Sequence, residues 1–154
     1  MSFPEQEIRD AYDRLVDTRG RVERGELSWD ALAAFFTVDA TFIDPAWGRI
    51  QGIDAIKEFL VESMQGLEDW TFPRVFTAVE GDILISGWQN RLPGRRPDGS
   101  YYEALGVSIM TYAGNGRFSR EEDVLNMAHV TELMKESGWR PGPGVNAPPS
   151  PVPR

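Results

Sequence analysis

The sequence predicts an α+β fold, with N-terminal helices packed on one face of a mainly antiparallel sheet. Apolar residues recur at helical spacing in the first 65 residues. Four later segments are instead rich in aromatic and β-branched residues, which suit strands: 70–79, 82–92, 101–113 and 117–126. Turn signals such as Gly114-Asn115-Gly116 join these segments, so the second half is expected to be a meander of four antiparallel strands.

Three helices are expected before this meander and one after it. Residues 5–24 carry apolar side chains at helical spacing with charges between them. A second helix follows Ser28, a favourable N-cap residue, and a short strand over 40–44 precedes a third helix over about 53–65. A last short helix over 127–138 follows Asn126, which is a second candidate cap.

Length and composition favour one globular domain. The chain has 154 residues, of which 41% are hydrophobic, enough for one sizeable core. We divide it into a domain over 1–138 and a Pro-rich tail over 139–154, which is expected to be an extended or disordered strap. There is no internal repeat and no second domain.

Charge and residue usage exclude several classes of function. The net charge of −8 argues against a nucleic-acid groove or an anionic membrane as partner. The absence of Cys and the single His exclude thiolate zinc sites and imidazole clusters. A site of carboxylate ligands alone stays open, but no EF-hand spacing is present, and neither a metal nor a cofactor is expected. The polar, acidic N-terminus is unlike a signal peptide, and a cytoplasmic location is therefore expected.

The segment 101–112 has two faces that are largely free of charge. One face has small residues at its middle: Ala104, Gly106 and Ser108. These cannot fill the space before them, which predicts a cavity between sheet and helices. The opposite face is bulky and aliphatic: Leu105, Val107 and Ile109. Such a face usually has a partner, so we expect a homodimer through the outer side of the sheet. The alternative is that the C-terminal segment covers it.

Several strings occur in an order known from one superfamily. "AYDRLVD" (11–17), "FTVDATFIDPAWG" (36–48), "GIDAIKEFL" (52–60), "GVSIMTYAGNGRF" (106–118) and "GRFSREEDVLN" (116–126) follow one another along most of the chain. In these strings the chain resembles the NTF2-like superfamily, within it the SnoaL-like and ketosteroid-isomerase-like branch. The resemblance implies a cone-shaped fold, in which the N-terminal helices lie in the concave face of a curved sheet.

The resemblance also implies catalytic residues. Asp44 lies where the isomerases have their general base, Tyr12 where they have the catalytic Tyr, and Asp123 where SnoaL-type cyclases have an acid/base Asp. Ser108 stands where the isomerases have an acidic oxyanion donor held neutral. A Ser hydroxyl can still donate, but it is a much weaker acid, and losing one strong oxyanion donor commonly costs about 10²–10³ in rate.

Each of these residues also has a structural interpretation. Asp44, with Pro45 after it, fits either a base whose pKa is raised by apolar walls or an Asx turn at a strand end. Tyr12 fits an oxyanion donor or a core Tyr bonded to a backbone carbonyl. Asp123 lies in the polar run "SREEDVLN", which is typical of an edge or solvated strand.

Three aromatic residues are candidates for substrate binding. Trp47 could wall the site beside Asp44, and Trp88 could stack on a flat substrate, although a Trp at that position is more often part of the core. Phe59 belongs to the apolar stripe of the third helix and is either pocket wall or helix core.

Two hypotheses follow. In the first, the chain is a cofactor-independent enzyme on a steroid, terpenoid or polyketide type of substrate, which it isomerises or cyclises by proton abstraction next to a carbonyl. Asp44 takes the proton, Tyr12 with Ser108 stabilises the enolate, and Asp123 returns or relays a proton. In the second, the chain is a non-catalytic dimeric pocket for a hydrophobic small molecule or partner.

Overall fold

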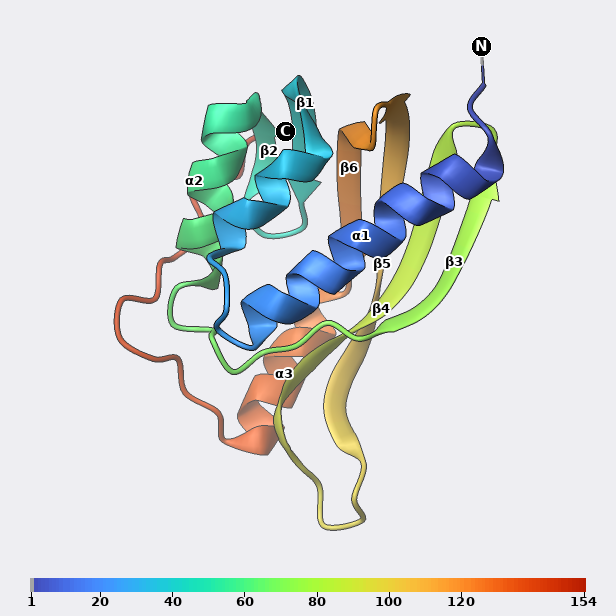
Figure 1. The fold of residues 1–154 in the computed structure, drawn as a ribbon. Helices are drawn as coiled ribbons and strands as arrows, with labels where there is room; N and C mark the ends of the chain where they lie inside the picture. The colour runs from blue at the N-terminus through green and yellow to red at the C-terminus, as the bar shows by residue number, and fades with distance from the viewer. Residues whose placement is uncertain (1) are drawn as a thin grey trace.

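The computed structural model describes residues 2–154 and confirms the α+β architecture (Figure 1). The helical elements are α1 (Glu5–Glu23), the short 3₁₀ helix η1 (Trp29–Phe35), α2 (Ile53–Met64) and α3 (Met127–Ser137). The strands are β1 (Phe36–Asp44), β2 (Gly48–Gln51), β3 (Arg74–Glu80), β4 (Ile83–Arg95), β5 (Tyr101–Gly114) and β6 (Arg117–Leu125).

The strands form one six-stranded sheet in the order β2-β1-β6-β5-β4-β3. The expected meander is confirmed, since β3, β4, β5 and β6 pair antiparallel in sequence order. The additional strand β1 pairs parallel with β6, with Phe42 opposite Glu121 and Ile43 opposite Glu122. If this register continues for one more residue, Asp44 lies opposite Asp123. The two residues are then close together, because neighbouring strands lie only about 5 Å apart.

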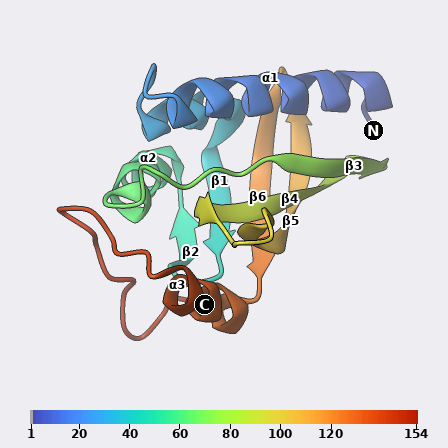
Figure 2. The same cartoon turned by 90° about the horizontal axis from the view of Figure 1, so that it is seen from below.

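Helices α1 and α3 pack on the same face of the sheet, well apart from each other (Figure 2). Strands β4 and β5 supply residues of this face to both packing regions. Leu84 and Met110 belong to the core cluster under α1, while Leu92 and Ala104 belong to the cluster under α3. The face between the two clusters is available for a cavity.

Several element boundaries differ from the expected ones. Strand β3 begins at Arg74, because Pro73 has no N–H to donate, and Thr71 forms only an isolated bridge with Arg91. The helix after Ser28 is a 3₁₀ helix. Strand β2 was not expected, and its tight hairpin with β1 requires Gly48, whose φ of +78° is unfavourable for other residues.

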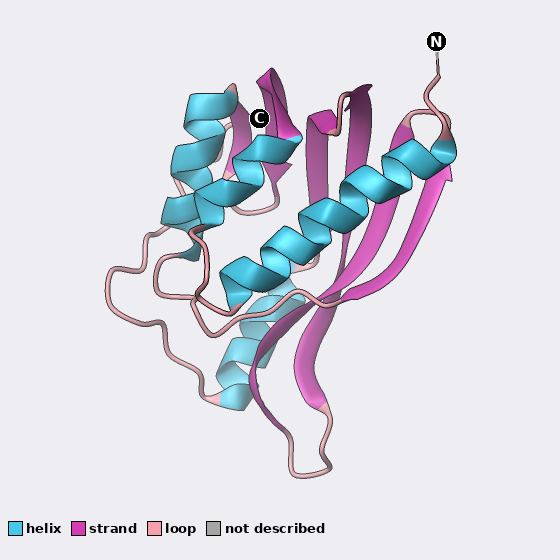
Figure 3. Ribbon diagram, viewed as in Figure 1, coloured by secondary structure: helices cyan, strands magenta, loops and turns pink. Residues whose placement is uncertain are grey.

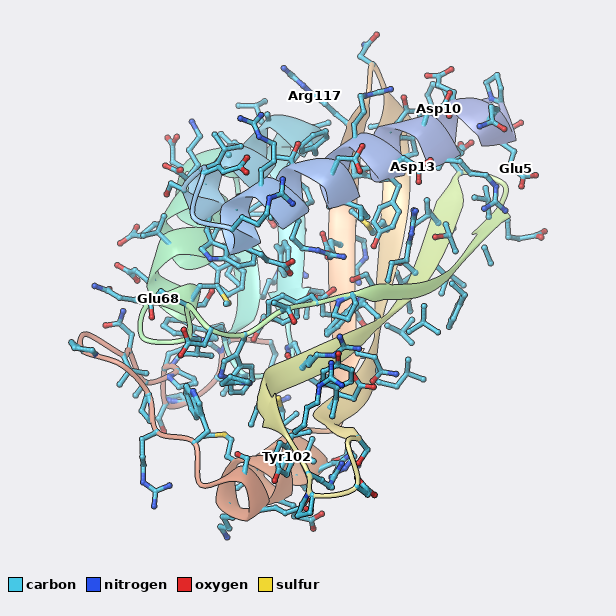
Figure 4. All side chains as sticks on the ribbon, turned by 60° about the horizontal axis from the view of Figure 1, so that its bottom comes forward. Glu5, Asp10, Asp13, Glu68, Tyr102 and Arg117 are labelled. Atoms are coloured by element: carbon cyan, nitrogen blue, oxygen red, sulfur yellow. The ribbon has the colours of Figure 1, made fainter. Side chains whose placement is uncertain are left out.

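The outer face of the sheet exposes apolar side chains. Those with the largest exposed fractions are Val75, Phe76, Leu105 and Val124. The C-terminal segment does not cover this face. Side chains at the surface of α1 are of the opposite character: Glu5, Asp10 and Asp13 are exposed along the helix (Figure 4). No helix within residues 2–154 is long and apolar enough to span a membrane.

Residues 139–154 form no helix or strand and run from α3 past α2 (Figure 3). Three backbone or side-chain groups anchor this segment, which we call the C-terminal strap. The Gly142 N–H donates to the Gly66 carbonyl (2.8 Å), and the Asn146 Nδ2 donates to the Glu62 carbonyl (3.0 Å). Further on, the Pro153 carbonyl accepts from the Arg49 N–H (3.0 Å).

Candidate functional site

A cavity of about 370 Å³ lies between the helices and the inner face of the sheet, a size within the range of small-molecule sites. Its walls are mostly apolar and aromatic: Leu15, Trp29, Phe36, Phe42, Trp47, Phe59, Leu60, Trp70, Phe72, Trp88, Val130, Met134 and Trp139. The C-terminal strap completes the wall with Pro141, Val145, Asn146 and Pro148. The strap therefore covers one side of the cavity.

The small residues on β5 contribute to this cavity in an unexpected way. A Cβ on Gly106 would collide with the indole ring of Trp88, so the space before Gly106 is filled by that ring. The ring is in turn held by its Nε1, which donates to the Ser108 Oγ at 2.9 Å. Gly106 therefore permits Trp88 to lie flat against β5 and to form a cavity wall.

Asp44 lines the cavity at the end of β1. Its Oδ1 accepts from the Ala46 N–H (2.8 Å) and the Trp47 N–H (2.7 Å), an Asx turn. Pro45 has no N–H to donate, and the next two residues supply the backbone donors instead. Burial raises the pKa of Asp44, and these two hydrogen bonds oppose the rise.

Two further carboxyl groups, those of Glu121 and Asp123, line the same cavity from β6. Ser108 bridges them, with its Oγ 2.6 Å from the Asp123 Oδ1 and 3.1 Å from the Glu121 Oε1. Burial raises the pKa of both carboxyls, and the neighbouring Glu121 raises that of Asp123 further, to well above its ordinary value. Asp44 contributes to both shifts. Since Ser108 bridges the two carboxyls in a mostly apolar cavity, ionisation of both at once is disfavoured.

The sequence pattern of β6 had favoured a solvated strand for Asp123. The structure instead places β6 between β1 and β5, and Glu121 and Asp123 line the cavity as partly exposed side chains. Glu121 was not among the predicted site residues. Its signal was the two-residue period, which puts Glu121 on the same face as Asp123, but the run of polar residues masked it.

The structure brings most predicted site residues together. Asp44, Asp123, Trp47, Trp88, Ser108 and Phe59 all line the cavity. Tyr12 is not among the lining residues. Its side chain is 1% exposed, and its hydroxyl has no hydrogen-bond partner within residues 2–154. Burial raises the pKa of Tyr12, and the positive charge of Arg19 opposes the rise.

The sequence analysis also missed several lining residues with side-chain N–H donors. Among them are Arg19 on α1, Trp70 before β3 and Asn90 on β4. Asn90 shares its strand face with Trp88, a signal that the alternation contained. No group of three or more His, Asp or Glu side chains within residues 2–154 is arranged to hold a metal ion.

Comparison with known families agrees with this architecture. The SnoaL-like domain model matches residues 11–121, so the chain belongs to the SnoaL-like domain family, whose fold is NTF2-like and ketosteroid-isomerase-like. No curated protein gives a significant match.

Solved structures show the same fold at low sequence identity. A candidate SnoaL-like polyketide cyclase from Jannaschia sp. CCS1 is 17% identical, with a TM-score of 0.66 over 86% of this chain and 94% of its own. An NTF2-like protein of unknown function from Burkholderia xenovorans LB400 is 23% identical (TM-score 0.59, 79% and 84% covered). TerC, co-crystallised with polyporic acid, is 19% identical (TM-score 0.61, 84% and 98% covered). At this identity the likeness establishes the fold alone.

Proposed function

We propose that the protein is a cofactor-independent acid/base enzyme that isomerises or cyclises an apolar, ring-containing carbonyl compound. The observation that carries this proposal is the convergence of Asp44, Glu121 and Asp123 on one mostly apolar cavity. Carboxyl groups whose environments push their pKa values apart can divide the roles of acid and base, as in the ketosteroid isomerase and lysozyme examples of this pattern.

In the proposed reaction, the Asp44 carboxylate removes a proton from the carbon next to the substrate carbonyl, which leaves an enolate. In a cyclisation, the enolate carbon then attacks a second carbonyl carbon, and protonated Asp123 gives its proton to the oxygen that becomes an alkoxide. Asp44 has gained one proton and Asp123 has lost one, so the net reaction consumes none. In an isomerisation, the proton returns to a different carbon of the same substrate.

Other residues support these two carboxyls. Ser108 and Glu121 hold Asp123 in place and keep its proton available. Trp47, Phe59 and Trp88 offer flat apolar surfaces to a steroid, terpenoid or polyketide type of substrate. Tyr12 stays a predicted oxyanion donor. Since its hydroxyl lies outside the cavity wall, this role requires a shift of the side chain when substrate binds.

The test is turnover of 5-ene-3-ketosteroids and polyketide ketones by the parent and by Asp44→Asn, Asp123→Asn and Tyr12→Phe variants. Loss of a general acid or base should lower kcat by about 10²–10⁴-fold. Asp17→Asn, an exposed carboxyl on α1, is the matched control and should retain full activity. Parental turnover by both the Asp44 and the Asp123 variant, on a substrate that the parent converts, would contradict the proposal.

A second candidate function is a dimeric binding pocket without catalysis. The hydrogen bonds of Asp44 to Ala46 and Trp47 favour it, because they give this carboxylate a purely structural task in the Asx turn. Native mass spectrometry of the purified protein distinguishes the two functions. An apolar ligand that is retained, together with no turnover on the ketone panel, supports the binding pocket.

A further inference from the structure

Arg19 lies in the cavity but has no part in the proposed acid/base steps. It donates from Nη2 to the Phe72 carbonyl at 2.9 Å, and it forms no ion pair within 4.0 Å among residues 2–154. Arg21, two residues further along the same helix, is exposed and paired with Glu26 at 3.1 Å. A guanidinium has five N–H donors, so Arg19 keeps donors for a ligand beyond the Phe72 carbonyl, although its charge also acts on Tyr12, Glu23 and Glu121.

Asn90 adds an independent sign of a missing acceptor. Its side chain lines the cavity and is only 4% exposed, yet its Nδ2 has no hydrogen-bond partner within the described residues. The Nε1 of Trp70, another buried lining residue, is likewise unpartnered. Buried donors are nearly always paired in folded proteins, which indicates that an acceptor is supplied from outside the chain.

These donors come from neighbouring positions of the fold. Thr71 bridges to Arg91, so the next pair along these antiparallel segments is Phe72 and Asn90. Arg19 is bonded to the carbonyl of that same Phe72. The Phe72 N–H donates to the Glu23 Oε1 (2.8 Å), so both backbone groups of Phe72 face away from β4. Arg19 and Asn90 therefore approach the cavity from opposite sides of this residue.

We propose that Arg19 and Asn90 form a subsite for an anionic oxygen of the ligand, so that the cavity takes aromatic or polycyclic acids. The planar guanidinium binds carboxylate and sulfonate oxygens in a fork geometry and is weakly hydrated, which suits a site with aromatic walls. The subsite rests on the proposed function in one respect, namely that this cavity is where the substrate binds.

Binding of two fluorescent probes tests the subsite without any turnover. 1-Anilinonaphthalene-8-sulfonate carries a sulfonate, and N-phenyl-1-naphthylamine has the same ring system without it. Their dissociation constants are measured by fluorescence titration of the full chain and of the Arg19→Met, Arg19→Lys, Asn90→Ala and Arg21→Met variants. Circular dichroism confirms that each variant is folded.

We expect Arg19→Met to weaken sulfonate binding by about tenfold to hundredfold and to change binding of the neutral probe by less than about twofold. Arg19→Lys should keep part of the preference for the sulfonate probe over the neutral probe. Asn90→Ala should lower this preference, and Arg21→Met should leave it unchanged. Equal losses for both probes in Arg19→Met, or an unchanged preference, would overturn the subsite and leave the catalytic proposal standing. If neither probe bound the parent chain, the subsite would be overturned, and the turnover assay would still decide the catalytic proposal.

Discussion

Replacing Asp123 by Asn tests the buried carboxyl pair through the pH dependence of stability. Burial holds the pKa of Asp44, Glu121 and Asp123 above the ordinary values of 3.8 for Asp and 4.5 for Glu. Above those values, the folded protein therefore binds more protons than the unfolded chain. Their contribution to stability is fully present below the unfolded pKa and is lost as the pH rises through the folded pKa.

The size of the effect follows from proton linkage. When a group is protonated in the folded state and ionised in the unfolded state, the free energy of unfolding falls by about 1.4 kcal/mol for each unit by which the pH rises. Asn cannot titrate, so in Asp123→Asn the free energy of unfolding should fall less steeply with pH, by up to this amount per pH unit. Its amide oxygen can still accept the hydrogen bond that Ser108 makes to Asp123 at 2.6 Å, so the change in packing is small.

The assay is urea denaturation at intervals from about pH 5 to about pH 8, since this range lies above the ordinary carboxyl pKa values. The stability of the parent should fall with pH, that of Asp123→Asn should fall less steeply, and the two curves should converge or cross toward higher pH. Asp17→Asn, which changes an exposed carboxyl on α1, is the control, and its stability should follow that of the parent. Equal slopes for parent and Asp123→Asn would refute the reasoning.

Two further predictions concern the surface. Gly66→Ala should release the C-terminal strap, because a Cβ there would lie 2.8 Å from the Val145 Cβ. Hydrogen exchange of residues 139–154 should then increase. Gly25→Ala, also at positive φ but without a neighbour within 4 Å, is the control and should leave this exchange unchanged. We also propose a homodimer through the outer face of the sheet, so light scattering should give about twice the chain mass of 17.3 kDa for the parent, and Leu105→Asp or Val124→Asp should give the monomer mass. A parent that is already monomeric would rule the dimer out.

Local patterns were sufficient for most of the fold. Helical spacing and turn residues located the helices and the antiparallel meander, because both depend on neighbours close in sequence. The pairing of β1 with β6 could not be read in this way, since it joins Phe42 to Glu121, two residues far apart in the sequence. That pairing makes β6 a central strand.

Part of the candidate site was also predictable from the sequence. Asp44 and Asp123 were identified by resemblance, and the alternation of β5 correctly put Ser108 on the cavity side. Glu121 and Arg19 are charged residues in segments that otherwise resemble solvated surfaces. Only the tertiary arrangement shows that their side chains reach the cavity.

The central claim is that carboxyl groups are kept from water in this cavity and hold protons there. Carbon-13 NMR titration of the side-chain carboxyls, with resonances assigned from the Asp44→Asn, Glu121→Gln and Asp123→Asn variants, measures this directly. The account predicts that all three groups titrate above 3.8 for Asp and 4.5 for Glu, with Asp123 the most displaced. Titration of Asp44 and Asp123 at the ordinary value for Asp would contradict it.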